Sequence, residues 1–160
     1  MAGCTRSPAR TTSWSMRAGR VAVRRTLEPY RAGDVGGRIT VDGPRLTLRT
    51  QTGVALTMIL HELATNAAKY GALSTPHGRL DVNWRREDSG GQPQIRLRWI
   101  EAGGPPVKTP SRRGFGSELI ERSTTHELHG QAILDYREEG LHGELTFPWN
   151  DSYAPGGSEA

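Results

Sequence analysis

One short segment, residues 61–70, combines residue types that could together perform phosphate chemistry. Glu62 and Asn66 are four residues apart. Lys69 and Tyr70 follow after another three and four residues, so a helix would place these side chains on one face. An amide oxygen suits Mg²⁺, an ammonium group suits a phosphate, and a neighbouring carboxylate can orient a reacting group or accept a proton. From spacing alone, an ordinary exposed polar helix face remains the alternative.

The histidines do not form a recognisable zinc site. His61 and Glu62 begin the zinc-protease pattern His-Glu-x-x-His, but Thr65 stands where the second histidine is required. His126 and His129 are three residues apart with no third ligand in view, which is typical of histidines on a helix surface.

A second candidate site is a carboxylate followed by glycines. Glu101 comes at the end of an alternating stretch, and Gly103 and Gly104 follow it. A carboxylate placed there can accept hydrogen bonds from a ligand amino group, and glycines allow a flat ligand to approach the backbone. An ordinary exit from a strand into a loop is the alternative.

A third candidate is the segment from Gly114 to Ser117, which leads into a predicted helix. Gly114, Phe115, Gly116 and Ser117 could expose backbone N–H groups at the helix N-terminus, which favours phosphate binding. A pair of glycines is a weak signal by itself. The segment lacks the Gly-Lys-Ser/Thr of a Walker A motif and the full Gly-x-Gly-x-x-Gly dinucleotide fingerprint.

Hydrophobic periodicity predicts the elements that must position these residues. Thr50 or Thr52 is predicted to cap a helix that runs to about Tyr70 and is ended by Gly71. Its apolar residues recur at steps of three and four and form a buried stripe: Leu56, Ile59, Leu60, Leu63 and Ala67. A second helix is predicted from Ser117 to about Leu128.

Strands are predicted on both sides of each helix, from alternation of polar and apolar residues. The first pair is expected to form a hairpin or two short strands, and the second pair an antiparallel hairpin. The predicted strands are residues 38–41 and 46–49, 79–85 and 94–100, then 132–136 and 141–147. This order predicts an α+β fold, a mixed, mostly antiparallel sheet with helices on one face. Prolines and glycines predict a long loop over residues 102–113.

The composition limits the class of protein. At 160 residues, the chain is about the size of one domain. Its longest apolar stretches are too short to span a bilayer, no secretory signal is recognisable, and the single cysteine, Cys4, excludes an intramolecular disulfide. These features predict a cytoplasmic protein.

The formal net charge of +4 is unevenly distributed. Residues 1–31 hold seven arginines and one acid, a net charge of +6, and the rest of the chain has −2. We expect a disordered basic head over residues 1–26, a globular domain over 27–150 and a flexible tail over 151–160. The head also resembles an organelle transit peptide, or could contact DNA, but a nucleic-acid partner is not expected for the domain.

Taken in order, the motifs resemble those of a known family. HELATNAAKYGALS, WIEAGGPPV and RGFGSELIE stand in that order, with a glycine before the final strand. This set is similar to the ATP-binding domain of HWE-type sensor histidine kinases, a branch of the GHKL ATPases. The name of the branch records a histidine and a Trp-x-Glu box, which here are His61, Trp99 and Glu101. The resemblance covers residues 27–149 and implies the two-layer α/β sandwich called the Bergerat fold.

The resemblance also implies roles for individual residues. Asn66 would coordinate the Mg²⁺ that bridges the ATP phosphates, Glu62 would act as a base or positioning group, and Glu101 would read the adenine amino group. Residues 102–117 would form a short lid over the phosphates. The residues implied to contact nucleotide are His61, Asn66, Lys69, Tyr70, Glu101, Gly103, Gly104, Gly114, Phe115, Gly116 and Ser117.

The implied function is a protein histidine kinase of a two-component system. It would use ATP and Mg²⁺ and transfer the γ-phosphate to a histidine on a separate dimerisation domain, and a response regulator would be the next partner. Residues 1–26 are too short and too polar to supply the two helices of such an acceptor domain. The alternative function is a catalytically silent module that binds ATP or a partner protein and regulates another kinase.

Overall fold

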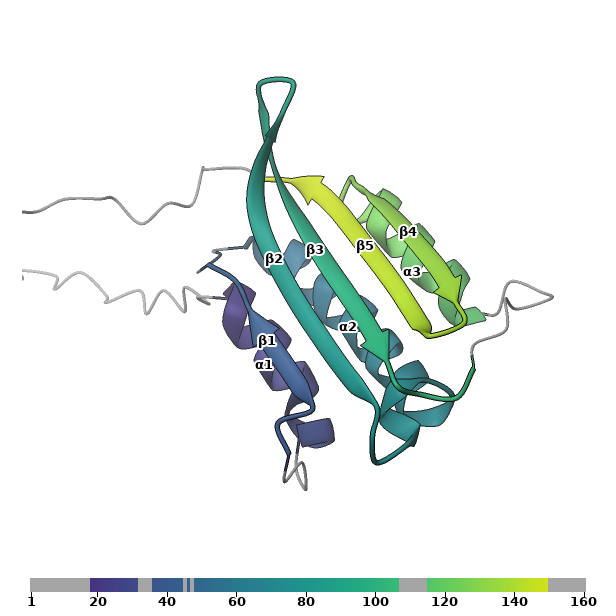
Figure 1. The fold of residues 1–160 in the computed structure, drawn as a ribbon. Helices are drawn as coiled ribbons and strands as arrows, with labels where there is room; N and C mark the ends of the chain where they lie inside the picture. The colour runs from purple at the N-terminus through teal and green to yellow at the C-terminus, as the bar shows by residue number, and fades with distance from the viewer. Residues whose placement is uncertain (1–17, 32–35, 45, 47, 107–114, 150–160) are drawn as a thin grey trace, which may run out of the picture.

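The fold is a five-stranded sheet covered on one face by helices, as seen in a computed structural model (Figure 1). The structure describes residues 18–31, 36–44, 46, 48–106 and 115–149. The elements, in chain order, are α1 (Ala18–Arg31), β1 (Ile39–Asp42), α2 (Thr50–Lys69), the 3₁₀ helix η1 (Ala72–Ser74), β2 (Arg79–Ser89), β3 (Gln92–Ala102), α3 (Phe115–His126), β4 (Gln131–Arg137) and β5 (Gly140–Pro148).

The sheet has the strand order β1-β2-β3-β5-β4. Strand β1 pairs parallel with β2, and every other pair is antiparallel. The parallel pair requires a crossover connection, and α2 provides it. The predicted α+β class, with a mixed and mostly antiparallel sheet and helices on one face, is therefore confirmed.

The first predicted hairpin is wrong. Residues 39–42 do form a strand, but its partner is β2, which lies beyond α2 in the sequence. Leu46 and Leu48 are buried, as their alternation suggested, yet neither lies in a strand. Their apolar side chains cover the core from an irregular segment.

The β2–β3 hairpin is confirmed, and it is longer and tighter than expected. The two strands pair from Arg79 with Ala102 up to Ser89 with Gln92. Only Gly90 and Gly91 remain in the turn, with φ of 62° and 80°. Two consecutive positive φ values match the type I′ geometry, which suits the twist of a two-residue hairpin.

Helix α1 corrects the expected boundary of the disordered head. Residues 18–26, assigned to the head, form the first part of this helix. Val23 and Leu27 are fully buried, and the Tyr30 hydroxyl lies 3.2 Å from Thr65 Oγ1 of α2. The spacing of four and three residues places these three side chains on one helix face. Residues 1–17 and 150–160, the rest of the predicted head and the tail, lie outside the described residues.

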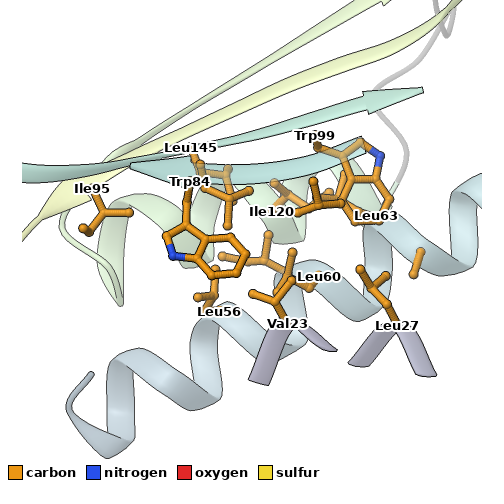
Figure 2. Close-up of a cluster of buried hydrophobic side chains, with 14 of the residues drawn as sticks. Val23, Leu27, Leu56, Leu60, Leu63, Trp84, Ile95, Trp99, Ile120 and Leu145 are labelled. Atoms are coloured by element: carbon orange, nitrogen blue, oxygen red, sulfur yellow. The ribbon is translucent and has the colours of Figure 1, made fainter. Parts of the chain in front are cut away.

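The core lies between the helices and one face of the sheet (Figure 2). Along β3 the side chains alternate, so that Ile95, Leu97 and Trp99 face the helices. Leu56, Leu60 and Leu63 of α2 are buried against them, which confirms the predicted stripe.

The other face of the sheet is polar. Arg96 lies on it and forms ion pairs with Glu87 of β2, at 2.6 Å, and with Glu144 of β5. The hydrogen bond from Arg96 keeps the pKa of Glu87 below its usual value.

Candidate functional site

The Glu101 carboxylate is buried at the end of β3 and hydrogen-bonded through both oxygens. Glu101 is 2% exposed. The backbone N–H of Ala72 donates to Oε2 at 2.8 Å, and the indole N–H of Trp99 donates to Oε1 at 2.8 Å. Each carboxylate oxygen has two lone pairs, so each retains the capacity to accept one further hydrogen bond. A ligand amino group is the kind of donor that this arrangement can still accept.

Glycines make room for this carboxylate. A Cβ atom built on Gly71 would overlap Glu101 Oε2, far inside the 3.0 Å below which real Cβ contacts essentially never occur. A Cβ on Gly104 would lie 2.7 Å from Ala72 Cα. We refer to Gly71, Ala72, Trp99, Glu101 and Gly104 as the Glu101 cluster. It joins the end of α2 to the end of β3 by backbone-to-backbone packing.

Burial raises the pKa of Glu101, because the charged form loses its hydration. The hydrogen bonds from Trp99 and Ala72 act in the opposite direction and favour the carboxylate. These two donors therefore support an anion in a site that would otherwise favour the neutral acid.

The polar face of α2 extends from the Glu101 cluster toward α3. Glu62 and Asn66 are half-buried, whereas Lys69 and Tyr70 at the end of the helix are exposed. The two half-buried residues are one helical turn apart, so they line a common face as predicted. His61 is exposed and lies about 100° around the helix from Glu62, so its side chain leaves in a different direction.

The N-terminus of α3 lies directly against Glu62. A Cβ atom on Gly116 would overlap Glu62 Oε1 and lie 3.0 Å from Glu62 Cδ. The structure therefore brings together a carboxylate of α2 and the first turn of α3, two segments more than 50 residues apart. The free N–H groups of a helix N-terminus suit a phosphate, and a nearby carboxylate suits a metal ion. Together they make a polar site that could hold a phosphate with its metal ion.

Two details of the sequence prediction differ in the structure, and a third lies outside the described residues. The cap of α2 is Arg49 and makes no side-chain hydrogen bond, so neither Thr50 nor Thr52 acts as the cap. Ser117 lies within α3 rather than at its cap, and its hydroxyl lies 3.0 Å from the Tyr136 hydroxyl. Gly114 and the side chain of Phe115 lie outside the described residues, as do residues 107–114, which are half of the predicted lid.

Gly103 shapes the start of the loop that follows β3. Its φ is 71°, in the left-handed region that favours glycine. Its carbonyl oxygen accepts a hydrogen bond of 3.1 Å from the Thr75 hydroxyl, which also accepts one from the Gly78 N–H. These contacts hold the loop against the segment that follows η1.

Sequence reasoning missed the two donors to Glu101. Trp99 is two residues before Glu101, and alternation along a strand would have placed both on one face. The Ala72 N–H is 29 residues away in sequence, and no local pattern identifies it. Gly71 was expected only to end a helix, but its lack of a Cβ also admits the carboxylate.

Other surface features lie away from this site. A hollow of about 300 Å³ runs along α3, lined among others by Leu119, Arg122 and His126. A second, of about 350 Å³, lies on the open face of the sheet beside Arg98, Ile133 and His142. Within the described ranges, no helix is long and apolar enough to cross a membrane, and no three His, Cys, Asp or Glu side chains are grouped as metal ligands.

The five-stranded sheet with three helices on one face matches the fold of histidine kinase catalytic domains. Solved structures share it. The histidine kinase domain of the blue-light-activated kinase EL346 from Erythrobacter litoralis matches 81% of this chain and 60% of that structure, with a TM-score of 0.61 at 17% identity. The catalytic domain of the histidine kinase ThkA matches 80% of this chain and 90% of its own length, with a TM-score of 0.59 at 16% identity.

Proteins with similar sequences are also histidine kinases. A blue-light-activated histidine kinase of Brucella anthropi is 38% identical over 129 residues, which are 81% of this chain. Its counterpart in Brucella ovis is 36% identical over 130 residues. The chain spans about a quarter, 26%, of the length of each. No protein-family model matches the chain. The chain is therefore homologous to a segment of these histidine kinases and has the fold of histidine kinase catalytic domains, as its motifs predicted.

Proposed function

We propose that this chain binds ATP with Mg²⁺ and acts as the catalytic domain of a sensor histidine kinase. It would transfer the γ-phosphoryl group to a histidine on a dimerisation domain, from which a response regulator would receive it. The observation that carries the proposal is the Glu101 cluster at the end of α2. An anchored carboxylate that can accept an amino group lies at one end of the helix whose polar face carries Glu62 and Asn66.

The side chains fit both parts of the nucleotide. Glu101 would accept the adenine amino group, and Gly103 and Gly104 would admit the flat base. Asn66 supplies an amide oxygen and Glu62 a carboxylate, both hard donors that suit Mg²⁺ held mainly by water and phosphate. Mg²⁺ would neutralise phosphate charge, and Lys69, exposed at the end of α2, would contact a phosphate.

Glu62 is the residue that we place closest to the chemistry. Phosphoryl transfer depends mainly on positioning and charge neutralisation. A carboxylate against the first turn of α3 can orient the attacking imidazole of an acceptor histidine or take its proton. Tyr70 is exposed at the end of α2, and we propose that it contacts the ribose or a phosphate at the edge of the site, whereas the His61 side chain leaves the helix in another direction.

Titration calorimetry with Mg-ATP tests binding, with Asn66→Asp as the variant. The added negative charge faces the triphosphate beside Glu62, and we expect at least a tenfold loss of affinity. Gln131→Glu is the matched control, because it makes the same amide-to-carboxylate change at an exposed residue of β4. Absence of binding heat for the unaltered chain, or equal affinity in Asn66→Asp, would contradict the proposal.

Transfer itself is tested by mixing the chain, radiolabelled ATP and a purified acceptor domain from a related kinase. We expect acid-labile label on the acceptor, and none with Glu62→Ala. A chain that binds Mg-ATP normally and never labels an acceptor would be the regulatory module instead.

A further inference from the structure

We propose that Trp99 is a positioning residue, whose indole N–H fixes the Glu101 carboxylate for recognition of the amino group of the nucleotide base. The inference rests on the proposed function, since it takes Glu101 as the group that reads the base. It gives Trp99 a specific role in the site, in addition to the packing that any buried aromatic residue provides.

The geometry shows how the two residues act together. Trp99 and Glu101 are two residues apart on β3, so both side chains face the helices. The indole N–H holds Oε1 and the Ala72 N–H holds Oε2, each at 2.8 Å. The two donors come from different elements, so the carboxylate can neither rotate nor shift without losing one of them.

A glutamate needs such anchoring. Its side chain has three rotatable bonds, and ordering them costs conformational entropy unless contacts in the free protein already fix them. Trp99 is fully buried and rigid, and it is a donor that cannot act as an acceptor. The carboxylate is therefore the only acceptor of the pair. It can accept a hydrogen bond from the amino group of adenine, and it would repel a carbonyl oxygen at the same position.

The indole also influences the charge of Glu101. Burial raises the pKa of this carboxyl group, and the Trp99 hydrogen bond lowers it. Loss of the indole N–H would raise the pKa further and increase the neutral fraction at a given pH. A protonated carboxyl group accepts an amino group less strongly than the anion does.

Trp99 also belongs to the core, so the test must separate packing from positioning. Trp84 provides a matched control within the same core. It is 3% exposed, and its indole N–H donates to the Pro44 carbonyl oxygen at 2.9 Å. Figure 2 shows the two indoles at separate places in the core. Trp84→Phe therefore removes an indole and a half-buried hydrogen bond without touching Glu101.

The experiment measures binding of two nucleotides by calorimetry in the presence of Mg²⁺. One is ATP, and the other is purine riboside triphosphate, which lacks the 6-amino group. We expect the unaltered chain to prefer ATP. Trp99→Phe should weaken ATP binding about tenfold and change the affinity for the analogue less than twofold, while Trp84→Phe keeps the preference.

A pH series gives a readout that loss of packing would not move. The ATP affinity of the unaltered chain should fall as pH drops through the pKa of Glu101. In Trp99→Phe this fall should begin at a higher pH, and in Trp84→Phe it should not shift. If Trp99→Phe folds poorly, 3-benzothienylalanine at position 99 keeps the size of the indole, replaces its N–H with sulfur and should reproduce the same two effects.

The outcomes distinguish the two proposals. Equal affinity of the unaltered chain for both nucleotides would refute the role of Glu101 in the proposed function. A preference for ATP that persists undiminished in Trp99→Phe and in the benzothienyl variant would overturn the role of Trp99 alone. Loss of preference in Trp84→Phe as well would show that core packing, not the hydrogen bond, controls the site.

Discussion

Gly71→Ala is the sharpest test of the Glu101 cluster, because it adds one carbon atom at its most crowded point. The new Cβ would overlap Glu101 Oε2 and lie 2.9 Å from Ala67 Cα. The far end of a glutamate can usually move aside. Here both oxygens are held, by Ala72 and by Trp99, and the side chain is buried. The carboxylate must therefore give up a hydrogen bond, or the end of α2 must shift.

The size of the effect follows from these two alternatives. Losing one hydrogen bond to a buried charged group costs about 1.5–3 kcal/mol. Forcing an extra methyl group into a packed region costs about 1–3 kcal/mol. Either route destabilises the fold by about 1–3 kcal/mol, which most domains survive with a stability of about 5–15 kcal/mol. The variant should fold, and its loss should be measurable.

Urea denaturation followed by circular dichroism measures the free energy of unfolding. Gly36→Ala is the control, because among the described residues beyond its chain neighbours the Cβ added there lies nearest to Arg38 Cγ, at 3.9 Å. We expect that control to change stability by less than about 1 kcal/mol. In a Glu101→Ala background the penalty of Gly71→Ala should shrink. If Gly71→Ala is as stable as Gly36→Ala, the packing described for Glu101 is wrong.

Two further predictions concern charge and chemistry. Burial raises the pKa of Glu101, so the folded state holds this proton more tightly than the unfolded state. The free energy of unfolding should therefore fall, relative to Glu101→Gln, as pH rises from the unfolded value of about 4.3 through the raised pKa. Urea titrations at several pH values measure this difference, and a flat difference would contradict the burial argument. Gly116→Ala should displace the Glu62 carboxylate and slow phosphoryl transfer at least tenfold, with a stability change below about 1 kcal/mol. Transfer rates and melting curves together check it, and an unchanged rate would remove Glu62 from the chemistry.

Periodic elements were predictable from the sequence where both partners are close along the chain. The stripe of α2 and the β2–β3 hairpin depend on spacings of three, four and two residues, and both are confirmed. The partner of β1 was not predictable in this way. It lies beyond a 20-residue helix, and the nearby alternation at Leu46 and Leu48 suggested a hairpin instead.

Helix α1 was missed because composition concealed its pattern. Arg24 and Arg25 are exposed, and with the arginines upstream they give the segment the appearance of a disordered basic tail. Val23 and Leu27 are the buried apolar residues described in this helix, too few to show a clear period, and tertiary packing on α2 stabilises the helix.

The sequence indicated which residue types would form the candidate site, but it did not indicate the contacts between them. The sequence indicated that Glu101 accepts hydrogen bonds and that Asn66 and Glu62 share a face. It did not indicate that a backbone N–H after α2 holds Glu101, because such a contact depends on how helix and sheet meet. Gly116 beside Glu62 is a second contact of this kind.

The tip of the β2–β3 hairpin offers an attachment point for a reporter group. Strand β5 pairs with β3 only as far as Gln94, and β1 pairs with β2 only as far as Asn83, so the tip stands beyond its neighbours (Figure 1). Apart from the adjoining residues, no heavy atom of the described part of the chain lies within 4 Å of a Cβ added at Gly90 or Gly91. Glu101 is at the other end of β3, about 30 Å away at a rise of about 3.4 Å per residue. A fluorophore at the tip would thus lie within energy-transfer range of a labelled nucleotide without disturbing its site.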